Sequence, residues 1–408
     1  MKKAVTLLLL INAVLVQAQE KKVKVTPYGF VALDIMADTR ESVTSRSGHV
    51  YLYPKRPVYD INGNDINANG NLDFKAAISR FGVKIAGPDA FGAKTSGVFE
   101  VDFAGKGSTD FSVRLRHAFV KLDWDNQNLI LGKYWHPFFI PENFPQTVNF
   151  VVGAPIHPLS RASQVRFTQS IAEHTSVAFV MLMHGDFSSV GPADQPQMTN
   201  IPETIVQLKH KTNNLLLAAT AGVKPQLPYS PTLDSEGYVH ESDVVYCPEF
   251  NVSAKYIFDK ITVKAEAIYG GSMTHLTMIG GLAQKAKDGV AIEGEYTPIM
   301  TSAYWGDVST NGKVVKFGVF GGVTNNLGTT TESVKADGYT RAADMGYTYM
   351  VAPRVVWYSG KMQVGLEWLY SVAAYNNDIA SDYDKYSRPT NLSDVHNNRI
   401  TLGMRYHF

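Results

Sequence analysis

Asn397-Asn398-Arg399-Ile400-Thr401-Leu402-Gly403-Met404-Arg405-Tyr406-His407-Phe408 alternates between two kinds of side chain. One face is apolar (Ile400, Leu402, Met404, Tyr406, Phe408), and the other carries Arg399, Thr401, Gly403, Arg405 and His407. A period of two is typical of a β-strand, because successive side chains point to opposite faces. With one apolar and one polar face, this strand fits a barrel set in lipid, with a wet lumen inside.

Similar segments recur along the chain and predict an all-β fold, a transmembrane antiparallel β-barrel of 16 strands. We expect the strands at 23–34, 72–86, 96–104, 111–124, 128–134, 162–171, 175–184, 202–211, 215–223, 247–258, 261–270, 296–310, 313–321, 347–358, 361–370 and 397–408. Short turns such as Asn311-Gly312 alternate with long loops, as expected for short periplasmic turns and long external loops. A soluble propeller is the alternative, but the chain lacks its repeat of about 40 residues.

The start of the chain predicts export. Lys2 and Lys3 precede an apolar run that ends at the small-x-small site Val16-Gln17-Ala18, which is typical of a cleaved signal peptide. The alternative, a membrane anchor, needs about 20 apolar residues, more than this run supplies. We therefore expect residues 1–18 to be a signal peptide and 19–408 to form the barrel, in the outer membrane of a Gram-negative-type bacterium. Cys247 is the single cysteine, so an internal disulfide is excluded.

The polar faces of the predicted strands are rich in Lys and Arg. The lipid face does not tolerate these residues, since each costs about 2–4 kcal/mol at mid-membrane. A basic lumen concentrates anions. The alternative is that neighbouring carboxylates such as Glu100, Asp102 and Glu367 neutralise them. The predicted basic pore lining is Arg80, Lys84, Arg114, Arg116, Arg166, Lys255, Lys264, Arg354, Arg399 and Arg405.

The loop over 135–161 is aromatic and rich in proline, and Glu142 is its only carboxylate. Such an apolar loop is unsuited to bulk water, and we expect it to fold into the lumen and constrict the pore. The predicted constriction is Pro141, Glu142, Asn143 and Phe144, with Glu142 opposite the wall of Arg80, Arg114, Arg116 and Arg166. A loop that contacts another subunit is the alternative.

The first long loop contains Asp60, Asn62, Asn64 and Asp65 beside glycines. Oxygen side chains at this spacing are compatible with a structural calcium site. The loop lacks the terminal Glu of an EF-hand, and runs of Asn and Gly also form plain turns. Apart from this possible calcium, we expect no cofactor.

Several motifs resemble the DcaP-like trimeric outer-membrane porins. They are Ile78-Ser79-Arg80-Phe81-Gly82, Gly97-Val98-Phe99-Glu100-Val101-Asp102-Phe103, Val113-Arg114-Leu115-Arg116-His117-Ala118-Phe119-Val120, Leu131-Gly132-Lys133-Tyr134-Trp135 and Pro141-Glu142-Asn143-Phe144. The resemblance covers about 78–155 and implies a sixteen-stranded trimer that passes small anions, dicarboxylates among them. It also implies a basic wall at Arg80, Arg114 and Arg116 and a constriction at 141–144. Some members have a helical N-terminal extension that this sequence does not match, so assembly through it is not expected.

The expected function is an outer-membrane porin for passive diffusion of small hydrophilic solutes, with a preference for anions such as dicarboxylates. Expected partners are outer-membrane lipid, small anionic solutes and two further copies in a homotrimer. The net charge of +1 gives no reason to expect nucleic acid. A barrel enzyme is an alternative, but the sequence has no nucleophile elbow and no His-Glu-x-x-His, so we expect no enzyme. A structural or adhesin barrel is the other alternative, although sixteen strands leave an aqueous channel.

Overall fold

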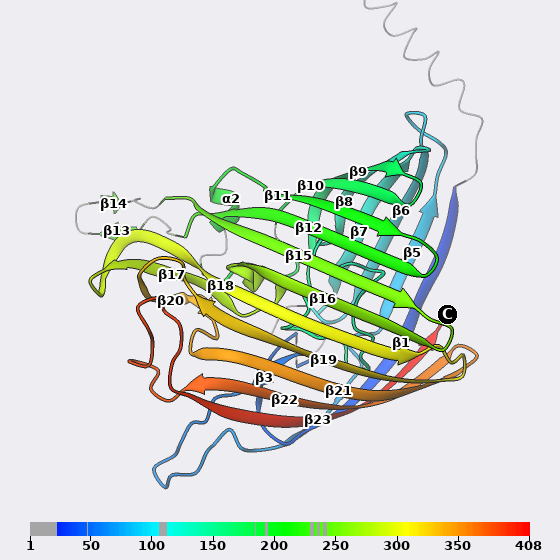
Figure 1. Cartoon of the computed structure of the whole chain (residues 1–408). Coiled ribbons are helices and arrows are strands. Elements are labelled where there is room, and N and C mark those ends of the chain that lie inside the picture. Colours follow the sequence, from blue (N-terminus) through cyan, green and yellow to red (C-terminus); the bar gives the residue numbers. More distant parts are fainter. Residues whose placement is uncertain are drawn as a thin grey trace, which may run out of the picture.

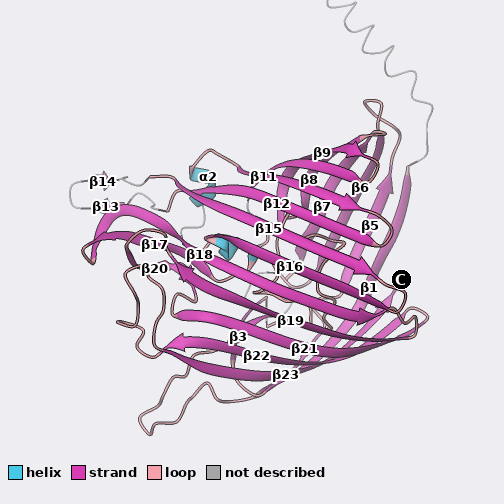
Figure 2. Cartoon of the chain, viewed as in Figure 1, coloured by secondary structure: helices cyan, strands magenta, loops and turns pink. Residues whose placement is uncertain are grey.

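The computed structural model describes residues 23–46, 48–105, 112–183, 185–191, 195–228, 232–234, 237–239 and 243–408. The predicted signal peptide, residues 1–18, lies outside these residues, as do Phe111 and His184 of two predicted strands. The described chain is dominated by strands that form the wall of one barrel (Figure 1). Among the residues that the structure describes, helix is limited to short pieces between strands, such as α2 (Gln195–Met198) (Figure 2).

The wall consists of sixteen spanning segments, one of which is made of two pieces, β4 and β5. The segments are β1 (Lys24–Asp38), β4 (Asn71–Lys75) with β5 (Arg80–Ala86), β6 (Lys94–Asp102), β7 (Arg114–Asp123), β8 (Gln127–Trp135), β9 (Arg161–Ala172), β10 (Thr175–Met183), β11 (Glu203–Lys211), β12 (Leu215–Gln226), β15 (Val245–Ile257), β16 (Ile261–Gly271), β18 (Val290–Thr310), β19 (Val315–Gly328), β21 (Met345–Ser359), β22 (Met362–Asn376) and β23 (Leu392–His407).

Pairing between the first and last strands closes the barrel. β1 pairs antiparallel with β23 from Phe30 opposite His407 to Asp38 opposite Arg399. β1 also pairs antiparallel with β5, with Lys24 opposite Ala86, so no edge strand is left in the wall. The predicted antiparallel sixteen-stranded barrel is confirmed.

Alternation of exposure identifies the two faces of the wall. On β15 the side chains of Phe250 and Val252 are exposed, whereas Asn251 and Ser253 are buried. An exposed apolar row is stable only where lipid covers it, so these side chains mark the membrane face. The buried polar row faces the interior of the barrel.

The strands continue further into the long loops than the alternation predicts. β18 begins at Val290 instead of 296, and β12 ends at Gln226 instead of 223. Two loop strands, β17 (Gly280–Lys287) and β20 (Ser333–Arg341), extend this region by pairing with each other, and β17 also pairs with β18. Outside the lipid, pairing of the strands still satisfies the backbone N–H and C=O groups. An apolar face is no longer needed there, so the alternation of side chains ends before the strand ends. A separate small hairpin joins β13 (Thr232–Asp234) and β14 (Gly237–Val239).

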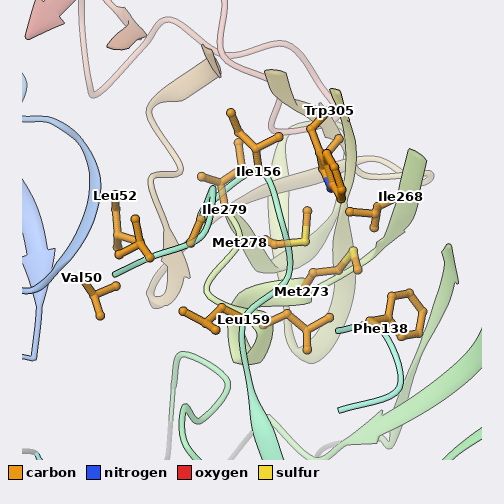
Figure 3. Packing of buried hydrophobic residues seen from close by; sticks show 14 of the residues in the cluster. Val50, Leu52, Phe138, Ile156, Leu159, Ile268, Met273, Met278, Ile279 and Trp305 are labelled. Atoms are coloured by element: carbon orange, nitrogen blue, oxygen red, sulfur yellow. The ribbon is translucent and has the colours of Figure 1, made fainter. Parts of the chain in front are cut away.

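Three segments fold into the barrel and build an apolar core inside it. They are the hairpin of β2 (Ser42–Ser45) and β3 (Val50–Pro54), the loop between β8 and β9, and the short helix η1 (Met273–Leu276) with its flanks. Figure 3 shows Val50 and Leu52 of the hairpin, Phe138, Ile156 and Leu159 of the loop, Met273, Met278 and Ile279 around η1, and the wall residues Ile268 and Trp305. The lumen is therefore partly dry, and the open passage is confined to what this core leaves free.

Candidate functional site

The loop over 136–160, called here the constriction loop, crosses the interior of the barrel. Lys209 on β11 lies 3.2 Å from the carboxylate of Glu142. Lys264 on β16 donates to the carbonyl of Phe144 at 2.9 Å. Further on, the backbone N–H of Val148 donates to Glu367 on β22 at 2.7 Å. Because β11, β16 and β22 lie at separate places around the wall, the loop spans the lumen.

Glu367 is the main anchor at the far side of the crossing. Besides Val148, it accepts hydrogen bonds from the backbone N–H and the side-chain amide of Asn149, at 3.3 and 2.8 Å. Arg405 on β23 donates to the carbonyl of Val148 at 3.0 Å. Three of these four bonds engage the backbone of the loop and therefore fix its path.

A second anchor holds the returning half of the loop. Nδ1 of His157 lies 2.7 Å from Glu266 on β16, and the indole N–H of Trp305 also donates to this carboxylate. His157 and Glu266 are both fully buried. A buried carboxylate is costly unless hydrogen-bonded, and here the loop itself supplies a bonding partner.

Aromatic rings stiffen the start of the loop. Trp135 stacks on Phe139 with ring centroids 3.7 Å apart and planes at 10°. Phe139 in turn stacks on Phe144 at 5.4 Å. These three rings form one continuous stack of large apolar surfaces at the start of the loop.

Beside the loop lies a cavity of about 490 Å³ whose lining is cationic. The constriction loop contributes Pro141, Phe144 and Phe150 to the lining, and the wall contributes Phe30 and Tyr358. Within the described part of the chain, the lining includes no Asp or Glu. The lining cations are Arg80, Arg116, Arg161, Lys316, Arg354 and Arg405.

Some of these cations pair with carboxylates on other strands of the wall. Arg116 binds Glu100 at 2.7 Å and Asp102 at 3.0 Å. Arg354 binds Asp307 at 2.8 Å. These carboxylates are nearly or fully buried and do not line the cavity. An ion in the cavity therefore meets the positive end of each pair first.

Within the described residues, no helix is long and apolar enough to cross a membrane. The model of the DcaP outer membrane protein family matches residues 14–222. This match covers more than half of the sequence. The chain belongs to the DcaP outer membrane protein family. Its localisation is the outer membrane, as the sequence predicted. No curated protein matches the sequence.

Solved porin structures share the fold. The outer membrane channel DcaP of Acinetobacter baumannii matches with a TM-score of 0.71 at 16% identity, over 95% of this chain and 97% of that one. The anion-selective porin from Comamonas acidovorans matches with a TM-score of 0.56 at 11% identity, over 95% and 100%. In vitro folded OmpT of Vibrio cholerae, in its trimer form, matches with a TM-score of 0.51 at 12% identity, over 95% and 100%. The family and the fold together identify this DcaP-family protein as a porin.

Four of the ten basic residues predicted to line the pore of this DcaP-family protein lie at the cavity: Arg80, Arg116, Arg354 and Arg405. Two others lie in the wall in buried ion pairs. Arg114 binds Asp102 at 2.5 Å, and Arg399 binds Asp38 at 2.7 Å.

The remaining four basic residues have other positions. Arg166 donates to the carbonyl of Trp135 at 2.9 Å. Lys255 and Lys264 hold the carbonyls of Glu142 and Phe144, so both tether the constriction loop. Lys84 is exposed and lines a separate groove on the barrel.

The predicted constriction residues divide in the same way. Pro141 and Phe144 line the cavity, whereas Asn143 is buried and donates to the carbonyl of Ala265 at 3.2 Å. Glu142 forms ion pairs with Lys209 at 3.2 Å and Lys211 at 3.5 Å. Of the four basic residues predicted to lie opposite it, Arg166 interacts with it electrostatically. The sequence predicted that the loop turns into the lumen, but not how far it extends across it. The loop brings Glu142 as far as β11. Burial alone would raise the pKa of Glu142, but Lys209 and Lys211 lower it below its usual value.

Arg161 is a cavity residue that the alternation could not find. It is the first residue of β9, where Arg161 and Ala162 are both buried, so the period of two fails at this position. Its guanidinium binds Asp186 at 2.6 Å. The one feature of the sequence that could have indicated a lumen position for Arg161 is its place at the end of the apolar loop.

The predicted calcium residues are occupied by protein donors. Asp60 accepts backbone N–H groups from Asn62 and Asn64, each at 2.8 Å, and these bonds lower its pKa. Asp65 pairs with Arg40 at 2.6 Å. This geometry is that of an Asx turn, with an ion pair between Asp65 and Arg40 beside it.

Proposed function

We propose that this porin passes small hydrophilic solutes by passive diffusion and prefers anions. The observation that carries the proposal is the cavity beside the constriction loop, whose described lining has six cations and no carboxylate. A lining of this kind raises the local concentration of anions and lowers that of cations. The paired carboxylates reduce the field but lie farther from the passage than their partners.

Dicarboxylates are the solute class that we favour. The lining cations come from an arc of the wall that runs from β19 and β21 through β23 and β5 to β7 and β9. A solute with two carboxylates can contact two guanidinium groups of this arc at once, and Arg binds carboxylates in a bidentate manner. The aromatic side chains in the lining, such as Phe144 and Phe150, provide apolar contacts for the carbon skeleton.

We further propose a homotrimer in the outer membrane. Trimeric porins have this fold, as the trimer form of OmpT illustrates. Symmetric closed assemblies are the common state of homo-oligomers. Chemical cross-linking of the protein in native membranes tests the proposal, since three copies are expected and a monomer alone would contradict it.

The deciding experiment is conductance in a planar lipid bilayer under a salt gradient. We expect open channels with a reversal potential of the sign that reports anion preference. The variant Arg80→Gln is expected to reduce that preference, because Arg80 lines the cavity. Lys84→Gln is the matched control, since it removes the same charge from the same strand outside the cavity. A channel that prefers cations, or no conductance at all, would overturn the proposal.

A further inference from the structure

Four potential metal ligands meet in the half of the barrel nearer the long loops. They are His136 at the start of the constriction loop, Glu203 at the start of β11, Glu249 on β15 and His275 in η1. One ligand atom of each lies within 4.8 Å of the other three. Their side chains are at most 2% exposed. Together these four residues are called the His–Glu cluster.

The ion-pair contacts within the His–Glu cluster join imidazole to carboxylate. Nε2 of His136 lies 2.8 Å from Glu203. Nε2 of His275 lies 3.6 Å from an oxygen of Glu203 and 3.6 Å from an oxygen of Glu249. The four side chains therefore converge on one small volume from four different segments.

Glu249 is the carboxylate of this volume with the weakest support among the described residues. Glu203 and Glu249 bring two carboxylates, and the buried Lys224 brings one ammonium, 3.5 Å from Glu249. Neither oxygen of Glu249 accepts a hydrogen bond from any described residue, although the side chain is fully buried. Buried carboxylates are stable when they are paired, hydrogen-bonded or bound to a metal. A divalent cation would supply a ligand bond to the carboxylate of Glu249.

We propose that the His–Glu cluster is a binding site for a divalent first-row transition metal, with Zn²⁺ as the reference ion. Two imidazoles and two carboxylates form a ligand set that suits such ions. Cys247 lies nearby, but its thiol donates to Gln226 at 3.4 Å, so no thiolate enters the set. Tetrahedral Zn²⁺ requires ligand atoms about 3.3 Å apart. Atoms within 4.8 Å of one another reach that spacing by small rotations of the side chains.

Metal binding changes the proton positions in both rings. Lys224 donates to Nδ1 of His275 at 2.8 Å, and the backbone N–H of Phe138 lies 3.3 Å from Nδ1 of His136. With Nε2 on the metal, both rings carry their proton on Nδ1 and give up these two contacts. Lys224 retains its second hydrogen bond, to the carbonyl of Ser272.

The site would connect two of the inward segments to the wall. His136 directly follows β8 and opens the constriction loop, and His275 belongs to the helix η1 that packs against this loop. The backbone N–H of Leu159, at the end of the loop, donates to the carbonyl of Leu276 at 2.9 Å. A bound ion would therefore fix both inward segments to β11 and β15, whichever solute the pore carries.

The test measures metal content and affinity in the purified full-length protein. The protein is stripped with a chelator in denaturant, refolded into detergent with Zn²⁺ or Co²⁺ and dialysed. We expect one ion per chain, a higher unfolding temperature with metal, and a Co²⁺ absorption spectrum typical of low coordination. Glu249→Gln and His275→Gln should each weaken the affinity at least as much as the loss of an outer-shell partner, which is about 10–100-fold.

His49→Gln is the matched control, because it changes another buried histidine of the same barrel, 2% exposed, that lies outside both the cluster and the constriction loop. It should bind the metal as the wild type does. Gel mobility with and without heating verifies that each variant is folded. If one of the two ligand variants does not fold, the affinity of the other one decides. A metal-free wild type after dialysis would overturn the proposal. Equal affinity in the wild type and a folded ligand variant would also overturn it.

Discussion

The guanidinium of Arg161 lies 3.6 Å from the ring centre of Trp135, and the two residues are directly opposite each other on β9 and β8. The constriction loop leaves the wall after Trp135 and returns to it at Arg161, so this cation–π contact closes the base of the loop. Phe139 stacks on the same indole ring. The position of the loop thus depends on one indole ring that contacts a cation from the wall and an aromatic ring from the loop.

The first prediction concerns this indole ring. Trp135→Ala removes the contacts to Arg161 and Phe139, which together contribute about 1–3 kcal/mol. We expect the unfolding temperature to fall and the single-channel conductance to rise or fluctuate, because the start of the loop loses its support. Trp135→Phe keeps a ring in place and should remain close to the wild type. Unchanged conductance in Trp135→Ala would show that the stack does not position the loop.

The second prediction concerns the anchor at the other end of the crossing. Glu367→Ala deletes the acceptor of the Val148 and Asn149 bonds, and hydrogen bonds to charged groups contribute about 1.5–3 kcal/mol each. Faster amide hydrogen exchange is expected at 147–150, with little change in the wall strands. The comparison is Glu41→Gln, which changes a half-exposed carboxylate paired with Lys55. If exchange at 147–150 remains slow in Glu367→Ala, the carboxylate is not the anchor.

The third prediction is a pH dependence of the inward hairpin. His49 lies in the turn between β2 and β3 and is 2% exposed, and burial, with Lys75 nearby, lowers its pKa to about 4. Arg114 also lowers this pKa, while Asp102 and Asp73 raise it. The folded hairpin buries the imidazole of His49 in its neutral form. The full stability of the hairpin is therefore present above the pKa of His49 in the unfolded chain, about 6.5. Stability is lost as the pH falls from there toward 4, by up to about 3 kcal/mol.

Hydrogen exchange at 43–53, corrected for intrinsic rates, measures this effect at pH 7 and at pH 4.5. The wild-type hairpin should open more often at the lower pH. His49→Gln cannot be protonated in this range, so its opening should not depend on pH through this group. An equal pH response in both proteins would assign the effect to other groups.

The sequence predicted the wall well because lipid penalises every error in the alternation. From Ile400 to Tyr406 each outward position of β23 is apolar, and the predicted strand differs from the observed one mainly at its start, 397 against Leu392. The start lies where the loop begins and lipid no longer selects the side chains. The break in the predicted strand 72–86, where β4 ends at Lys75 and β5 begins at Arg80, has no alternation signal either.

The partners of the lumen charges were less predictable. Arg114 and Asp102 are opposite each other on adjacent strands, so their pairing follows from a hairpin register. Arg399 and Asp38 are 361 residues apart and meet only because the barrel closes. Glu367, considered as a partner for lumen cations, instead holds the backbone of the constriction loop. Local alternation predicts which face of the wall a side chain lies on. The ion-pair partner of that side chain can be identified only in the closed barrel.

The fourth prediction separates the field of the cavity from the net charge of the protein. Asp34 is buried and lies 3.9 Å from Arg405, which lines the cavity and also donates to the carbonyl of Val148. Asp34→Asn removes a negative charge behind the lining without releasing Arg405, because the bond to the Val148 carbonyl remains. We expect the reversal potential to shift further toward anions. Asp60→Asn changes the net charge equally, in an exposed external turn, and should leave the potential almost unaltered because salt screens it. Equal shifts in both variants would mean that selectivity follows overall charge, and that the cations facing the cavity do not set it.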